Sequence, residues 1–177
     1  VPYKTFRNKR EYVNTAKWAM ENYGSEGAMI KRPDMKYPIK TRGENRTDQM
    51  IKIKSLKEID VMVWEVIPKI SKKTGKPMDT YMYEAVYLIP PEKKDEFWGV
   101  VEYKGKYYAP IGRSYSTSVK CKRGDIITVM PIRIRQYEED GLIKYTWMFP
   151  FFKEKRTDKK EPDTLTTVER LAELGTG

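Results

Sequence analysis

Apolar and polar residues alternate along most of the chain beyond residue 58, and Gly, Pro and Asp stand at the breaks. A period of two is typical of strands that bury one face. The pattern predicts strands over residues 59–67, 81–89, 97–103, 106–111, 126–137 and 142–153. The two central strands are predicted to form a hairpin about Lys104 and Gly105. Five or six strands of this length, separated by turns, favour a small closed barrel of the OB-fold type.

The first 57 residues follow a different pattern. Apolar residues recur at helical spacing behind Asn8, a favourable N-cap, and Glu11 stands at the reciprocal capping position. Two short alternating strands follow and end at Lys31 and Lys54, with a loop rich in Pro, Gly and Lys between them. A two-stranded ribbon is marginally stable alone. Residues 1–57 are therefore expected to be the end of a domain whose front half is missing.

These patterns together predict a mainly β fold with some α (α+β). Residues 58–177 are expected to form the OB-fold β-barrel and a C-terminal tail. Thr166 and Glu169 stand at capping-box spacing near the end of the chain, which predicts a short C-terminal helix.

Composition narrows the chemistry. The 177 residues include 35 basic and 25 acidic side chains, and the resulting net charge of +10 favours a polyanionic partner such as nucleic acid. The absence of His excludes His general bases, His-ligated metals and Ser-His-Asp triads. Cys121 is the only cysteine, so no disulfide forms within the chain and a reducing, cytoplasmic location is expected. No apolar run is long enough to span a membrane.

Two lysines and one glutamate in the first segment carry a chemical signal. Lys52 and Lys54 lie two positions apart in a predicted strand, so they share one face and suit a phosphate as fixed point charges. Glu26 precedes Gly27, which lets a ligand approach the backbone closely. The carboxylate of Glu26 suits a metal ion or a ribose hydroxyl.

A third segment, FPFFKEKRTDK over residues 149–159, leaves the last predicted strand. The order of EGAMIK, an Arg-Thr loop, IKIK and this third segment resembles motifs IV, V and VI of the covalent nucleotidyltransferases. These comprise ATP-dependent DNA ligases, RNA ligases and mRNA capping enzymes. The acidic linker that follows, and Thr166-Thr167 beyond it, are similar to the continuation in ATP-dependent DNA ligases. The resemblance covers nearly the whole chain. It implies that residues 1–57 end an ATP-grasp-like nucleotidyltransferase (adenylation) domain.

The resemblance implies a role for each matching residue of the first segment. Glu26 would be the carboxylate that helps to bind the catalytic divalent metal. Lys52 and Lys54 would contact the nucleotide α-phosphate and stabilise the charge that develops during phosphoryl transfer. Lys31 and Arg46, which flank the loop between the two motif strands, are expected in the same nucleotide site.

In the third segment, Arg156, Asp158 and Lys159 match motif VI, which in this family orients the β- and γ-phosphates. Arg156 and Lys159 are the expected catalytic residues, and Asp158 is an expected nucleotide contact. Phe151 and Glu154 depart from the family, because they stand where motif VI usually carries basic residues.

The chain has no K-x-D-G, the motif that holds the nucleophilic lysine of this family. The resemblance therefore implies the C-terminal portion of an ATP-dependent DNA ligase. Such an enzyme uses ATP and Mg²⁺ to seal nicked duplex DNA in replication, repair and recombination, through lysyl-adenylate and DNA-adenylate intermediates. This portion is expected to be a monomer that binds DNA without self-adenylating. The alternatives are an RNA ligase or capping enzyme, and a non-catalytic OB-fold DNA-binding module.

Two groups of basic residues are candidates for DNA contact. Arg133 and Arg135 alternate with apolar residues and share one strand face, which is equally typical of an ordinary solvated face. Lys104 and Lys106 are interleaved with tyrosines, a combination found in nucleic-acid surfaces that stack bases and bind phosphates. Aromatic residues of a barrel are more often part of its core.

Overall fold

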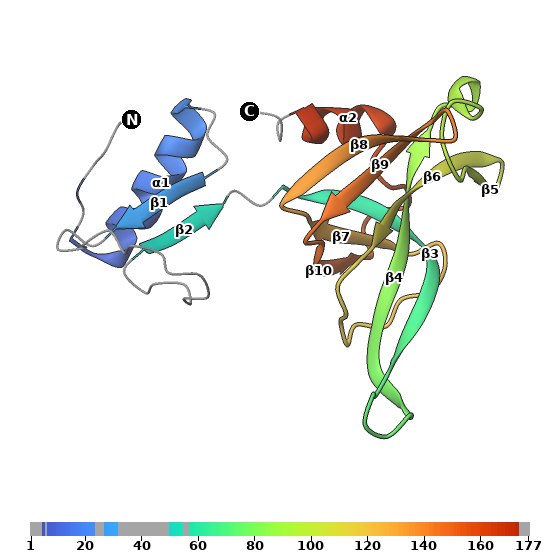
Figure 1. The fold of residues 1–177 in the computed structure, drawn as a ribbon, viewed down its shortest axis with the longest axis horizontal. Helices are drawn as coiled ribbons and strands as arrows, with labels where there is room; N and C mark the ends of the chain where they lie inside the picture. The colour runs from blue at the N-terminus through green and yellow to red at the C-terminus, as the bar shows by residue number, and fades with distance from the viewer. Residues whose placement is uncertain (1–4, 6, 24–26, 32–49, 55–56, 174–177) are drawn as a thin grey trace. The chain divides into compact units, whose positions relative to one another are not determined.

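The computed structural model describes residues 5, 7–23, 27–31, 50–54 and 57–173. The chain divides into two compact units, residues 1–55 and residues 56–176 (Figure 1). Each unit is described by itself below.

The first unit contains α1 (Lys9–Tyr23), β1 (Gly27–Lys31) and β2 (Met50–Lys54). Asn8 caps α1 as expected, since its Oδ1 accepts a hydrogen bond from the Glu11 amide at 2.9 Å. The Glu11 carboxylate in turn accepts a bond from the Arg7 amide at 3.0 Å. β1 and β2 pair antiparallel, with Gly27 opposite Lys54.

The second unit is mainly β with one helix longer than a single turn, and its fold is OB-like. This confirms the predicted fold class. Its main sheet is antiparallel in the order β10-β7-β3-β4-β6-β5. β8 and β9 form a separate hairpin (Figure 1). The elements are β3 (Ile59–Ile70), β4 (Pro77–Ile89), the 3₁₀ turn η1 (Pro91–Lys93), β5 (Val101–Tyr103), β6 (Lys106–Arg113), β7 (Ile126–Met130), β8 (Arg133–Glu139), β9 (Leu142–Met148), β10 (Phe151–Arg156) and α2 (Leu165–Glu173).

Proline divides two of the expected strands. Residues 126–137 form β7 and β8 on the two sides of Pro131, and residues 142–153 belong to β9 and β10 on the two sides of Pro150. Proline has no N–H to donate to a ladder, so the strands change partner at these points. β7 pairs with β10, whereas β8 pairs with β9. Phe149, with a φ of 54°, contributes to the second break.

Other boundaries also differ from the expectation. β5 covers only the end of residues 97–103, because Gly99 adopts a φ of 67° and turns the chain before the ladder begins. The hairpin about Lys104 and Gly105 is confirmed, and their φ values of 48° and 76° are those of a tight primed turn. α2 begins at Leu165, just before the predicted capping residue Thr166.

The expected closed barrel is not completed by a continuous ladder among the described strands. Side chains bridge β6 and β9 instead. Trp147 Nε1 donates to the Arg113 carbonyl at 2.9 Å, and Thr146 Oγ1 donates to the Ile111 carbonyl at 3.3 Å. Gly112 makes room for the indole, because a Cβ there would lie 2.9 Å from Trp147 Nε1. The indole thus occupies the seam in which a backbone ladder would run.

The two faces of the main sheet are different. On β3, Val61 and Val63 point into the large core, which α2 also joins through Val168 and Leu171. The intervening residues point the other way and define the outer sheet face, which comprises Asp60, Met62 and Trp64 of β3, Val86 and Leu88 of β4, Tyr108 of β6, and Ile126 and Thr128 of β7. Among the described residues, no helix is both long and apolar enough to cross a membrane.

Candidate functional site

A buried carboxylate lies at the centre of the most connected polar cluster of the described residues. Asp60 interrupts the apolar run of β3 and is only 8% exposed. Thr128 stands opposite it on β7, and the Thr128 hydroxyl donates a hydrogen bond to Asp60 Oδ1. A carboxylate in such a position requires several donors to offset its lost hydration.

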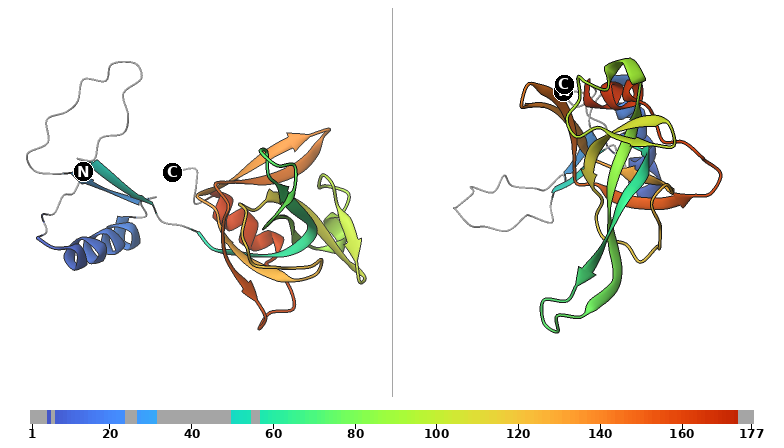
Figure 2. Two further views of the ribbon diagram at one scale, coloured as in Figure 1. Left: turned by 90° about the horizontal axis from the view of Figure 1, so that it is seen from below. Right: turned by 90° about the vertical axis from the view of Figure 1, so that its right-hand side faces the viewer.

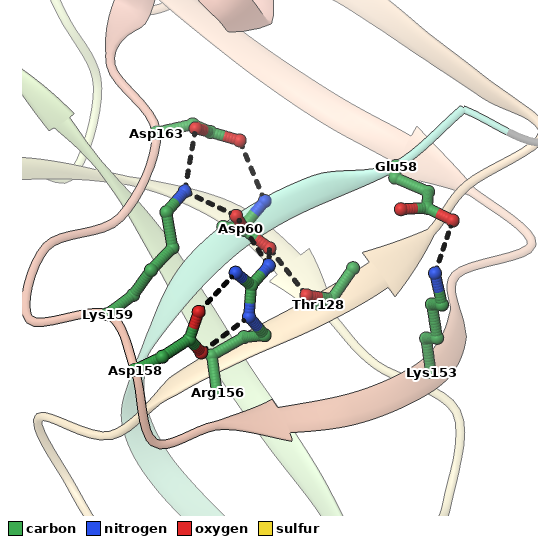
Figure 3. A network of polar contacts seen from close by, with 8 residues as sticks. All are labelled: Glu58, Asp60, Thr128, Lys153, Arg156, Asp158, Lys159 and Asp163. Carbon is green, nitrogen blue, oxygen red and sulfur yellow. Dashed lines mark hydrogen bonds and ion pairs between the residues drawn. The ribbon is translucent and has the colours of Figure 1, made fainter.

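The donors come from the last residue of β10 and from the segment that follows it (Figure 3). Lys159 Nζ lies 2.5 Å from Asp60 Oδ2, and Arg156 Nη1 lies 3.3 Å from the same oxygen. Arg156 also makes a two-pronged contact with Asp158, at 2.9 and 2.8 Å. Asp163 closes the network, because its carboxylate accepts the Asp60 amide at 2.8 Å and lies 3.7 Å from Lys159 Nζ. Figure 3 draws these six residues together with Glu58 and Lys153.

The network keeps its members charged. Burial alone raises the pKa of Asp60, but hydrogen bonds from Lys159 and Thr128 and the nearby positive charges outweigh it, so the pKa is lowered. The hydrogen bond from Arg156 lowers the pKa of Asp158 to about 2. The hydrogen bond to Asp60 raises the pKa of Lys159, and the bond to Asp158 raises that of Arg156. All four groups are therefore ionised at neutral pH.

The three motif VI residues of the sequence expectation are thus brought into one cluster. Its two cations face three carboxylates, namely Asp60, Asp158 and Asp163. Exposure differs strongly among these groups: the Asp158 side chain is 65% exposed, whereas that of Asp60 is 12% exposed. The Asp158 pair is consequently solvated and weak, while the Asp60 pairs fix the segment to the sheet.

The predicted nucleotide residues of the first unit are only partly described. Lys52 and Lys54 lie on β2, where Lys52 is opposite Met29 of β1, but their side chains lie outside the described residues. Lys31 is exposed at the end of β1. Glu26 and Arg46 lie outside the described residues. In the part of the chain that the structure describes, no three Asp, Glu or Cys residues are grouped to hold a metal ion.

The predicted DNA contacts fall on two separate surfaces. Lys104 and Lys106 flank the β5–β6 turn and line one concavity. Arg133 and Arg135 on β8 line another concavity, which they share with two glutamates of α2.

Asp60 is the residue that sequence reasoning missed. Its signal is a lone carboxylate within Ile59-Asp60-Val61-Met62-Val63, a run that otherwise indicates a fully buried strand. An ionised side chain there requires a partner. That the partners would be Arg156 and Lys159 depends on strand pairing that no local pattern reveals.

Comparisons with known proteins add little. No protein-family model and no curated protein matches the sequence. Two solved structures that carry the names "Pmar-Lig_PreS3" and "Pmar-Lig_Pre." align with 86% and 88% of this chain, at 21% identity and TM-scores of 0.46 and 0.47. The chain spans 32% of the length of each of them. A likeness this weak carries no argument about function.

Proposed function

We propose that this chain is the C-terminal portion of an ATP-dependent DNA ligase, which seals nicks in duplex DNA. The observation that carries the proposal is the cluster of Arg156, Asp158 and Lys159 on an OB-fold-like unit. These three residues match motif VI. Arg156 and Asp158 contact each other, and Arg156 and Lys159 both contact Asp60.

The first unit supports the same function. The strand that matches motif IV and the strand that matches motif V are hydrogen-bonded neighbours, with Gly27 opposite Lys54. The pairing makes the two motifs neighbours in the fold, which suits a single nucleotide-phosphate site. Glu26 itself lies outside the described residues.

Arg156 could reach a phosphate only by exchanging a partner. Its contact with Asp158 is the one to exchange, because that carboxylate is largely solvated and its ion pair contributes little. A phosphate likewise offers two oxygens that a guanidinium can bind at once, and it carries more charge. Lys159 and Asp60 would hold the segment in place during this exchange.

ATP and Mg²⁺ are part of the proposal as the expected cofactors, and the metal would supply electrostatic stabilisation of the transferring phosphate. Among described residues no ligand set for the metal is present, since Glu26 lies outside them. No step of the reaction is therefore assigned to the metal ion.

The test is nick sealing by a longer protein. The reading frame upstream of Val1 would be examined for K-x-D-G, and the extended protein would be assayed on a 5′-phosphorylated nick with ATP and Mg²⁺. Sealing that requires Lys52 is the expected result. Labelling by GTP in place of ATP would favour a capping enzyme, and sealing of RNA alone would favour an RNA ligase.

A non-catalytic OB-fold DNA-binding module is the second candidate. It is favoured by the neutralisation of Arg156 and Lys159 within the chain, which leaves neither cation unpaired. If the chain is such a module, the extended protein should bind DNA and should not be labelled covalently by a nucleotide. The same two assays therefore separate it from the ligase.

A further inference from the structure

A basic concavity of about 470 Å³ lies on the outer sheet face. Three segments that are distant in the sequence form its rim: the β5–β6 turn, the turn before β7, and the segment that follows Lys159. We call it the lysine groove. Its rim cations are Lys104, Lys106, Lys122, Arg123 and Lys160, its carboxylates are Asp125 and Glu161, and its floor includes Met62, Tyr103 and Tyr108.

The carboxylates of the lysine groove are already engaged. Glu161 forms an ion pair with Lys106. Asp125 lies 3.1 Å from Lys155 Nζ, outside the groove, and also accepts the Lys122 amide at 2.9 Å.

Three rim lysines are left to meet an external anion. Among the described residues, the ammonium groups of Lys104, Lys122 and Lys160 form no ion pair, and all three side chains are exposed. Lys104 Nζ instead lies 5.3 Å from the centre of the Tyr103 ring. The groove therefore holds a concentrated positive charge that the fold itself does not neutralise.

The floor of the groove is held rigidly. The Tyr103 ring packs edge-on against the Trp64 ring, with centroids 6.1 Å apart. The Arg123 guanidinium lies over the same Trp64 ring, 4.5 Å from its centre. Arg123 Nε also donates to the Trp64 carbonyl at 2.7 Å. Gly124 allows the close approach of Tyr103, because a Cβ there would lie 3.0 Å from the phenol oxygen. An aromatic floor fixed in this way suits the apolar face of a sugar.

We propose that the lysine groove binds the phosphodiester backbone of one strand of duplex DNA. The lysines come from three separate segments around the concavity, so they suit successive phosphates of a polymer. The half-buried ring of Tyr103 between them suits the deoxyribose that joins those phosphates. The proposal rests on the proposed function, in which the chain binds DNA, and it assigns that binding to a specific surface.

The test replaces Lys104, Lys122 and Lys160 together by Gln in the full 177-residue chain. Gln removes the charge and retains most of the side chain, and none of these lysines has an ion pair to lose within the described part of the chain. The affinity for a fluorescein-labelled duplex is measured by anisotropy at several salt concentrations. Each lost phosphate contact lowers the steepness of the log–log salt dependence by about 0.9, so a fall of about 2.7 is expected.

The matched control replaces Lys72, Lys73 and Lys76 by Gln. These exposed lysines lie in the turn at the end of the β3–β4 hairpin, which projects from the sheet (Figures 1 and 2). The control changes the net charge by the same amount, and we expect it to leave the salt dependence unchanged.

The outcomes separate the inference from the proposed function. The lysine groove is not the DNA-binding surface if the groove variant keeps the wild-type salt dependence. The same holds if the control variant loses as much salt dependence as the groove variant. Both results leave DNA binding by the chain intact. A wild-type chain that does not bind the duplex at low salt overturns the DNA-binding function, and the groove with it. Melting temperatures equal to that of the wild-type chain would show that both variants are folded.

Discussion

Replacing Asp60 by Asn tests whether the buried carboxylate holds the segment after β10 on the sheet. Asn has nearly the same shape, and it retains a carbonyl that can accept the hydrogen bond from Thr128. It removes the negative charge that Arg156 and Lys159 share, and the amide NH2 that replaces the second oxygen accepts no hydrogen bond from either cation. The variant therefore removes the contact with the two cations while the shape of the side chain is kept.

The magnitude follows from the exposure of the three groups. Removing one partner of a fully buried ion pair costs about 3–5 kcal/mol. Here the Arg156 and Lys159 side chains are 26% and 36% exposed, so water compensates both cations in part. A loss of about 2 kcal/mol is expected, which corresponds to a fall of about 8 °C in melting temperature for a domain of this size.

The effect should also depend on pH in one direction. The pKa of folded Asp60 is lowered below its ordinary value of 3.8. Its contribution to stability is therefore complete above that value and is lost as the pH falls through the lower, folded pKa. The wild-type chain and Asp60→Asn should differ by a constant amount at neutral and mildly acidic pH, and should converge only in stronger acid.

Thermal unfolding followed by circular dichroism over this pH range measures both effects. Asp158→Asn is the control, since its carboxylate is largely exposed and its loss should change the melting temperature little. If Asp60→Asn melts at the wild-type temperature at neutral pH, or if the two variants lose equal stability, the anchoring role of Asp60 is wrong.

Four further outcomes are expected. The 177-residue chain incubated with ATP and Mg²⁺ should form no covalent adenylate, because it has no K-x-D-G; radiolabelled AMP retained after denaturation would contradict this. In the extended protein, Lys52→Ala or Lys54→Ala should slow nick sealing by about 10²–10³ while the fold is retained, and sealing at the wild-type rate would exclude their motif V role. Replacing Arg133 and Arg135 by Ala should reduce the salt dependence of DNA binding less than the lysine-groove variant does, since two glutamates line the same concavity; the opposite ranking in anisotropy titrations would move the main DNA contact to β8. Gly112→Ala should lower the free energy of unfolding, measured in urea, by about 1–3 kcal/mol, because the added methyl group displaces the indole in the β6–β9 seam; an unchanged midpoint would mean that the seam relaxes freely.

Much of the fold could be predicted because its signals are local. Alternation predicts a strand over part of each described strand of the second unit, although it joins β7 to β8 and β9 to β10, and a glycine marks the turn at Lys104 and Gly105. Pro131 and Pro150 indicate the two strand breaks, yet each proline lies within a continuous apolar pattern. What that pattern conceals is the exchange of partners, which depends on strands elsewhere in the sheet.

The candidate site was predictable only in part, because it combines a local motif with non-local pairing. The resemblance predicts a shared role for Arg156, Asp158 and Lys159, and the structure places them in one cluster. It did not reveal that Asp60, about a hundred residues earlier, would be their partner. Nor could alternation place Lys104 and Lys122 in one groove, since the turns that carry them meet only after the sheet has formed.

The geometry of β10 explains why simple alternation fails at the site. Phe152 is opposite Val129 and packs on the large core, so strict alternation would point Arg156 toward the core as well. A β-bulge between Phe152 and Glu154 inserts one extra residue and reverses the facing of everything after it. Arg156 consequently stands opposite Ile126 on the outer sheet face, where it reaches Asp60. The bulge therefore allows β10 to place Phe152 against the core and Arg156 in the polar network. The segment that continues from β10 supplies Lys160 to the lysine groove.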